Sequence, residues 1–229
     1  MDDVWIFGDS FVDLNWHNDV AYSWVEELSK NYNVRNRALM GTGPEYSLRN
    51  LRNALHEFPF DDLKNTCLIF VCSGFERLNL NFWNDPQEQV MFPVIASGDE
   101  NHRFKHFAKD VFKYYIDFDW LADTELKYYC TLKHLSQYFK QTLYWQVTPR
   151  YPINQRFIDS NPSNFCFPET GLNDLSLRDN GGKRLGPVAD ERRNHFSKIN
   201  HQIIYNQLVE WIETGAHIDT SKIVDATKL

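Results

Sequence analysis

Residues 67–72 read CLIFVC, and Ser73-Gly74 follow them at once. Six apolar residues in a row, stopped by turn-forming residues, predict a strand that is buried on both faces. Residues 4–7 read VWIF and stop at Gly8-Asp9-Ser10, which repeats the same pattern. Strands buried on both faces need helices above and below them, an arrangement typical of parallel sheets.

The rest of the chain alternates between helical and extended patterns. The last helix is expected to begin after the N-cap Ser197 and to end at Gly215. Alternation of this kind predicts an α/β fold with three layers, α/β/α, around a central parallel sheet. The other elements expected are helices at 19–30 and about 44–57 and strands at 33–38 and 143–147.

No repeat, low-complexity tract or linker divides the chain, so its 229 residues are expected to form one domain. Residues 104–140 are helical in pattern and dense in aromatic side chains, which indicates a helical insertion in the core fold. An alternative use of these aromatic side chains is a platform for a sugar or a partner protein. Residues 150–194 are rich in Pro, Asn, Asp and Gly and predict a long loop region with little regular structure.

Composition argues against several classes of protein. The net charge is −7, and nucleic acid is not the expected partner because phosphate binding depends on Lys and Arg. No uncharged apolar run reaches the length of about 20 residues that a bilayer requires. The N-terminal residues lack the basic stretch and cleavage site of a signal peptide. We therefore expect a soluble, cytoplasmic protein that binds neither nucleic acid nor membrane.

The chain has four widely spaced cysteines and no CxxC pair. In a chain long enough to build its own core, such cysteines are expected to be reduced and buried. They are Cys67, Cys72, Cys130 and Cys166.

Ser10 comes directly after the first predicted strand. In open parallel sheets, ligands bind outside the carboxyl ends of the strands. A serine there, with a helix after it, would present its hydroxyl and its N–H group where developing negative charge is stabilised. The structural alternative is a strand-to-helix turn in which Ser10 is only an N-cap.

Asp190, Glu191 and His195 lie just before the last helix. A serine hydroxyl is a weak nucleophile until a base takes its proton, and the base needs a carboxylate to orient it. The chain supplies all three residue types in loops beside predicted element ends. His201 lies inside the last helix and is expected to be a packing or surface histidine.

Together these residues resemble the SGNH, or GDSL-like, hydrolase superfamily. The resemblance covers roughly residues 3–80 and 140–214. It implies a flavodoxin-like SGNH hydrolase fold, with Ser10 as nucleophile, His195 as base and Gly41 as a donor in the oxyanion hole. The four similar blocks are 7–13 (FGDSFVD), 36–43 (NRALMGTG), 73–77 (SGFER) and 195–201 (HFSKINH).

Two departures from the family pattern bear on the chemistry. Glu76 stands where the family has an asparagine that donates to the oxyanion, and a carboxylate donates only when it is protonated. Arg192 stands where the family has its aspartate, so Asp190, or failing that Glu191, is the expected orienting acid. Because adjacent residues leaving a strand point in different directions, we expect Arg77 to face the nucleophile and Glu76 to turn away.

The preferred hypothesis is a serine esterase-type hydrolase that works through an acyl-enzyme and uses no cofactor. Family analogy favours a small ester or an O-acylated glycan as substrate, with O-acetylated carbohydrate first. The alternative is a catalytically weak or inactive SGNH-like domain that binds a glycan or a protein. Third blocks with Glu-Arg resemble those of phage-carried SGNH proteins, so the alternative includes a viral protein of the virion or host cytoplasm. Glu76 favours the alternative, whereas Ser10 and His195 favour the hydrolase.

No metal site is expected. His102 and His106 have the i, i+4 spacing of a helical metal site, but without a nearby carboxylate pattern they suggest a solvated helix face. Asp117 and Asp119 are expected to be an acidic pair beside a helix.

Overall fold

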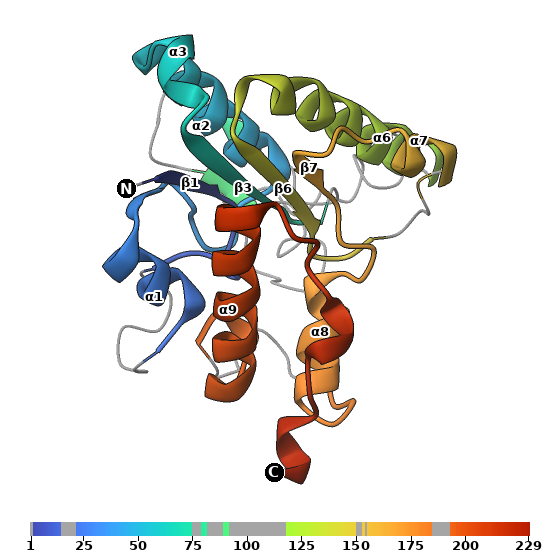
Figure 1. Ribbon diagram of the computed structural model, residues 1–229. Helices are drawn as coiled ribbons and strands as arrows, with labels where there is room; N and C mark the ends of the chain where they lie inside the picture. The colour runs from blue at the N-terminus through green and yellow to red at the C-terminus, as the bar shows by residue number, and fades with distance from the viewer. Residues whose placement is uncertain are drawn as a thin grey trace.

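A central sheet of five strands separates two layers of helices in a computed structural model of the protein (Figure 1). All four pairings in this sheet are parallel. The expected three-layer α/β/α fold is therefore confirmed. The structure describes residues 2–14, 22–74, 79–81, 89–91, 118–149, 153, 155–184 and 193–229.

The strand order across the sheet is β2-β1-β3-β6-β7. This is the doubly wound, flavodoxin-like order, in which ligands bind at the switch point between the first and third strands. A separate antiparallel pair joins β4 (Asn79–Asn81) to β5 (Gln89–Met91). The strands of the main sheet are β1 (Asp3–Phe7), β2 (Asn33–Asn36), β3 (Thr66–Cys72), β6 (Gln141–Gln146) and β7 (Phe165–Cys166).

Side chains of the central strands alternate between the two faces of the sheet. In β1, Val4 and Ile6 belong to one apolar cluster, and Trp5 and Phe7 belong to the other. All residues of β3 are buried. The long apolar runs in the sequence therefore come from strands that are covered on both sides.

Helices α1 (Trp24–Asn31) and α9 (Lys198–Thr214) cover the first face, and α2 (Pro44–Glu57) and α6 (Phe118–Leu135) cover the second (Figure 1). A short helix, α3 (Phe60–Leu63), precedes β3. As expected, α9 follows Ser197 and ends at Gly215, which has a φ of +76°.

Helix α6 makes the crossover from β3 to β6 and packs on the sheet. Its residues Tyr128 and Tyr129 are buried in the core beside Tyr144, so these rings are core residues rather than parts of an open platform. Residues 104–117 of the predicted insertion lie outside the described residues.

Two regions differ from the sequence-based expectation. Helix α1 begins at Trp24 rather than at 19, because Ser23 caps it by accepting the Glu26 N–H at 3.2 Å. The expectation of little regular structure over 150–194 was wrong for α7 (Gln155–Asp159), β7 and α8 (Leu172–Asp179). The turn-forming residues there do mark turns, but these turns separate short elements.

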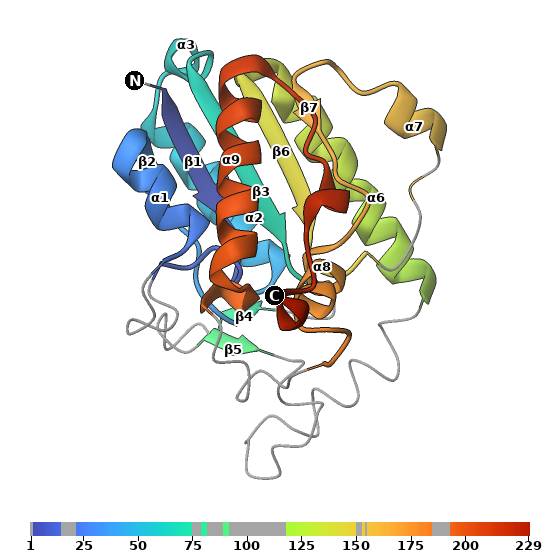
Figure 2. The same ribbon diagram turned by 60° about the horizontal axis from the view of Figure 1, so that its bottom comes forward.

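The C-terminal residues pack against α9. Ile218 and Ile223 are buried in the same cluster as that helix. Asn200 donates to the Val224 carbonyl at 2.7 Å and accepts the Val224 N–H at 3.0 Å. In Figure 2, the C-terminus lies beside α8. The sequence contains no clear signal for this packing.

Three of the four cysteines are buried, and all four thiols are free. Burial raises the pKa of the Cys67 thiol to about 12 and that of Cys166 to about 11. Cys130 is exposed, which corrects the expectation that every cysteine is buried, because it lies on the outer side of α6. Within the described ranges, no helix combines the length and the apolar character needed to cross a bilayer.

Candidate active site

Ser10 lies in a tight turn just beyond the end of β1. The Asp9 carbonyl accepts the N–H groups of Val12 at 3.0 Å and Asp13 at 2.9 Å, and the Asp9 carboxylate accepts the Phe11 N–H at 3.1 Å. The turn therefore stands at the carboxyl edge of the sheet, next to the switch point between β1 and β3. The expected helix directly after Ser10 is not found over residues 10–14, because Asp9 closes a turn there instead.

Gly8 allows this turn to pack closely against β3. A Cβ atom at Gly8 would lie 2.5 Å from Val12 Cγ2 and 2.9 Å from Val71 Cβ, both below van der Waals contact. Glycine is therefore needed here for the close approach of two segments.

His195 contacts Ser10 from the other end of the chain. The Ser10 Oγ and His195 Nε2 atoms are 2.9 Å apart, although 185 residues separate them in the sequence. The expected proximity of the two side chains is therefore found. The Phe11 ring lies against the imidazole, with the ring centroids 4.6 Å apart, and this packing limits rotation of the histidine ring. Figure 2 shows β1, β3 and β6 ending at the same edge, with α8 and the start of α9 beside it.

Helix α8 supports the segment that carries His195. The Ser176 hydroxyl donates to the His195 carbonyl at 2.8 Å. The buried Asp179 carboxylate accepts the Ser197 N–H at 2.6 Å and, at 2.5 Å each, the Ser197 hydroxyl and the Asn200 amide. Ser197 is the N-cap of α9 as expected, but its hydroxyl bonds to Asp179 instead of capping the helix.

Gly41, the expected oxyanion-hole glycine, lies on the loop after β2. Its φ of +73° is in the left-handed region that favours glycine. Two hydrogen bonds join this loop to the nucleophile turn: Leu39 N–H donates to the Gly8 carbonyl at 3.1 Å, and Met40 N–H donates to the buried Asp13 carboxylate at 2.7 Å. The loop is thus fixed at Leu39 and Met40, directly before Gly41.

The two backbone groups expected to bind an oxyanion have no acceptor in the described part of the protein. Neither the Ser10 N–H nor the Gly41 N–H donates a hydrogen bond to any of the described residues. Buried N–H groups are almost always paired in folded proteins, and Ser10 is only 8% exposed. A donor of this kind is suited to a bound oxygen.

The remaining predicted site residues cannot be placed. Asp190, Glu191, Glu76 and Arg77 lie outside the described residues. The identity of the orienting acid and the directions of Glu76 and Arg77 therefore stay predictions. The third block begins within the described residues at Ser73, whose hydroxyl donates to the Thr42 carbonyl at 2.9 Å and joins the end of β3 to the Gly41 loop.

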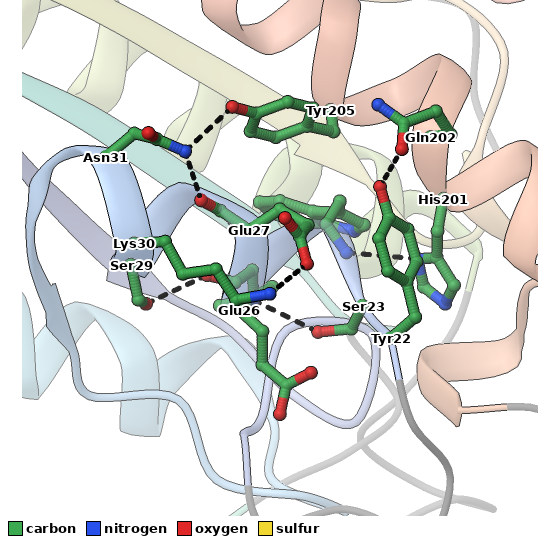
Figure 3. Close-up of polar contacts among 12 residues, drawn as sticks. Tyr22, Ser23, Glu26, Glu27, Ser29, Lys30, Asn31, His201, Gln202 and Tyr205 are labelled. Carbon is green, nitrogen blue, oxygen red and sulfur yellow. Dashed lines mark hydrogen bonds and ion pairs between the residues drawn. The ribbon is translucent and has the colours of Figure 1, made fainter.

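His201 has the packing role expected of it. It is buried in α9, and its Nδ1 accepts the Trp24 N–H at 3.3 Å, which joins α9 to the start of α1 (Figure 3). Beside it, the Tyr22 hydroxyl donates to Gln202. These contacts belong to the interface between two helices.

Across the described ranges, no group of three or more His, Cys, Asp or Glu side chains is arranged to hold a metal ion. His102, His106 and Asp117 lie outside those ranges, and Asp119 is an exposed residue of α6.

No protein-family model and no curated protein matches the chain. The likeness to SGNH hydrolases therefore depends on the similar sequence blocks, and the functional argument depends on the geometry around Ser10.

Sequence reasoning missed four polar or aromatic supports of the site, three of which had a weak signal. Phe11 and Asp13 adjoin the nucleophile, and Asn194 adjoins the histidine. Asparagine is also the residue other than glycine that best tolerates left-handed backbone. Asp179 had no signal at all, because its partners are 18 and 21 residues away.

Proposed function

We propose that the protein is a serine hydrolase of the esterase type, with Ser10 as nucleophile and His195 as general base. The observation that carries this proposal is the 2.9 Å separation of Ser10 Oγ and His195 Nε2 at the carboxyl edge of the sheet. The imidazole takes the hydroxyl proton while Oγ attacks the ester carbonyl, and it then returns the proton to the leaving alcohol. Water then attacks the acyl-enzyme carbonyl while His195 takes its proton. The carboxylic acid leaves, and the proton returns to the Ser10 oxygen.

The backbone N–H groups of Ser10 and Gly41 stabilise the oxyanion in this mechanism. One such donor contributes about 10²–10³ in rate. Because Glu76 replaces the asparagine that supplies a third donor in the family, we expect weak turnover of small acetyl esters. Arg77→Ala should lower this turnover further, whereas Glu76→Asn should leave it unchanged or raise it.

Asp190 is the proposed orienting acid. A neutral imidazole that accepts a proton at Nε2 carries its own proton on Nδ1, and an acceptor there fixes this tautomer. Asp190→Asn should reduce turnover about 10²–10⁴-fold. If Glu191→Gln causes that loss and Asp190→Asn does not, Glu191 holds the role.

The proposed substrate class is an O-acylated carbohydrate or another small ester, and this part follows from the resemblance to SGNH hydrolases alone. A panel of acetyl esters with sugar and simple alcohol leaving groups would separate the two. A preference in kcat/KM for the sugar esters would support the carbohydrate assignment.

The test of the proposed function is labelling with a fluorophosphonate probe, which reacts with activated serines. The wild-type protein should be labelled at Ser10, and Ser10→Ala should abolish labelling. His195→Gln should slow it strongly. Ser29→Ala is the matched control, because among the described residues the Ser29 hydroxyl bonds to the Val25 carbonyl within α1, away from Ser10. Absence of both labelling and Ser10-dependent ester turnover in the wild type would favour the alternative, an SGNH-like binding domain.

A further inference from the structure

Asn194 lies immediately before His195 and joins two loops that are far apart in the sequence. Its side-chain amide donates to the Ser10 carbonyl at 2.7 Å and to the Asp13 carbonyl at 3.0 Å. The side chain is completely buried. One amide group therefore connects the segment that carries the base to the turn that carries the nucleophile.

The backbone of this segment has positive φ angles, which residues other than glycine rarely adopt. The φ angles of Asn194 and His195 are +45° and +66°. Asparagine tolerates left-handed backbone better than most residues, and tertiary contacts hold both residues in it here. The contacts are present here on both sides: the Asn194 amide bonds to the nucleophile turn, and the His195 carbonyl accepts from Ser176 in α8.

We propose that Asn194 is a positioning residue for the Ser10–His195 pair. Two links then join the same two segments of the chain: the His195 ring meets the Ser10 hydroxyl, and the Asn194 amide meets the Ser10 carbonyl. The second link does not involve the reacting oxygen. It therefore persists when Ser10 Oγ carries an acyl group and can no longer donate a proton to the imidazole. The consequence for catalysis rests on the proposed function, whereas the positioning itself does not.

The side-chain nitrogen of Asn194 makes both hydrogen bonds to the nucleophile turn. Asn194 Oδ1 is buried without a hydrogen-bond partner in the described part of the protein. Asn194→Gly therefore removes the two hydrogen bonds while keeping a residue that adopts positive φ without strain. Asn194→Ser keeps a short side chain that can donate one hydrogen bond, and it should have an intermediate effect. Asn206→Ala, on the exposed side of α9, is the control.

The test measures the contact between Ser10 and His195 first, without any reaction. In the wild type, Ser10→Ala should shift the imidazole NMR signals of His195, assigned through His195→Gln. In the Asn194→Gly background, the same substitution should no longer shift them. Urea unfolding and circular dichroism of each variant identify the conditions under which it is folded.

The second measurement is the rate of fluorophosphonate labelling at Ser10. A displacement of about 1 Å at a reacting group lowers rates about 10²-fold, so Asn194→Gly should label 10- to 100-fold more slowly. For an acetyl ester, kcat per folded molecule should fall while KM stays within about twofold. The folded fraction is taken from the unfolding curves, because unfolded protein lowers the apparent kcat without changing KM. Asn206→Ala should behave as the wild type.

The two proposals fail in different ways. If folded Asn194→Gly keeps the NMR response and labels within twofold of the wild type, the positioning role is refuted. If the wild type does not react with the probe, but Asn194→Gly still abolishes the NMR response, the hydrolase proposal fails and the positioning role stands. If neither Asn194→Gly nor Asn194→Ser folds, Asn194 is required by the fold and the positioning inference is overturned.

Discussion

Replacing Asp179 by alanine tests how strongly the buried carboxylate of α8 holds the segment that follows His195. Asp179 is 1% exposed and accepts three hydrogen bonds, from the Ser197 N–H, the Ser197 hydroxyl and the Asn200 amide. The substitution leaves all three donors without this acceptor at the start of α9.

The expected loss follows from these three bonds. Each buried donor left without its acceptor costs about 1–3 kcal/mol, because it stays desolvated, so the three donors together lose at least about 3 kcal/mol. The Ser197 hydroxyl is then able to turn and cap α9, which recovers about 1 kcal/mol. We therefore expect Asp179→Ala to lower the free energy of unfolding by at least about 2 kcal/mol. Asp179→Asn should cost less, because its amide oxygen still accepts from part of this set.

Urea unfolding followed by tryptophan fluorescence measures this loss. The midpoint should fall while the m-value stays constant, because the folded and unfolded states keep their compactness. Asp174→Ala is the matched control: Asp174 is an exposed acid in the first turn of the same helix, where it contributes under about 1 kcal/mol. If Asp179→Ala costs no more than Asp174→Ala, the carboxylate does not anchor α9 as argued.

Four further outcomes are expected. Gly8→Ala should destabilise the protein by at least about 1–3 kcal/mol in urea, because the new Cβ comes within 2.5 Å of a buried side-chain atom. Asp13→Ala should slow probe labelling of the folded protein at least tenfold, since it releases the Met40 N–H and with it the loop that carries the oxyanion glycine. Native protein should show one fast thiol with a disulfide reagent, and Cys130→Ser should remove it. Burial raises the pKa of Cys67 from 9.0 to about 12, so only the unfolded chain releases this proton between those values. Stability should therefore fall as the pH rises through that range, and Cys67→Ala should flatten the decline measured by urea midpoints.

The central strands were predictable because each is a continuous apolar run that ends at turn-forming residues. Strands β1, β3 and β6 all lie within two residues of their expected positions. Helix α2 matches its expected range, because Pro44 at its start fixes a helical φ and lacks the N–H that a first turn leaves unpaired. In these elements the local pattern and the tertiary environment favour the same structure.

Elements that depend on distant partners were not predictable. Strand β7 has only two residues, too few for any periodicity, and it forms because it pairs with the exposed edge of β6. Likewise, Asp179 and Asn194 are polar residues that a sequence pattern assigns to the surface. They are buried because groups from other segments satisfy them, and such groups leave no mark in the neighbouring sequence.

The site itself was predictable only in part. The resemblance to SGNH hydrolases named Ser10 and His195, and the order of the strands explains why they meet. Ser10 follows β1 at the switch point, and α9 begins at the same edge of the sheet (Figure 2). The polar groups that hold the two residues together have no equivalent signal in the sequence.

The two functional hypotheses make different demands on the segment before α9. A binding domain needs only a stable loop there, and glycine would adopt the φ angles of +45° and +66° without steric cost. Instead, the segment carries two side chains there: Asn194, which tolerates positive φ better than most residues, and His195, for which the conformation costs up to about 1–2 kcal/mol. Both side chains contact Ser10, one at its carbonyl and the other at its hydroxyl. Packing of the core gains little from an imidazole held against a serine hydroxyl, whereas proton transfer requires that placement. The position of His195 against Ser10, kept in spite of its positive φ, therefore favours the hydrolase over the binding domain.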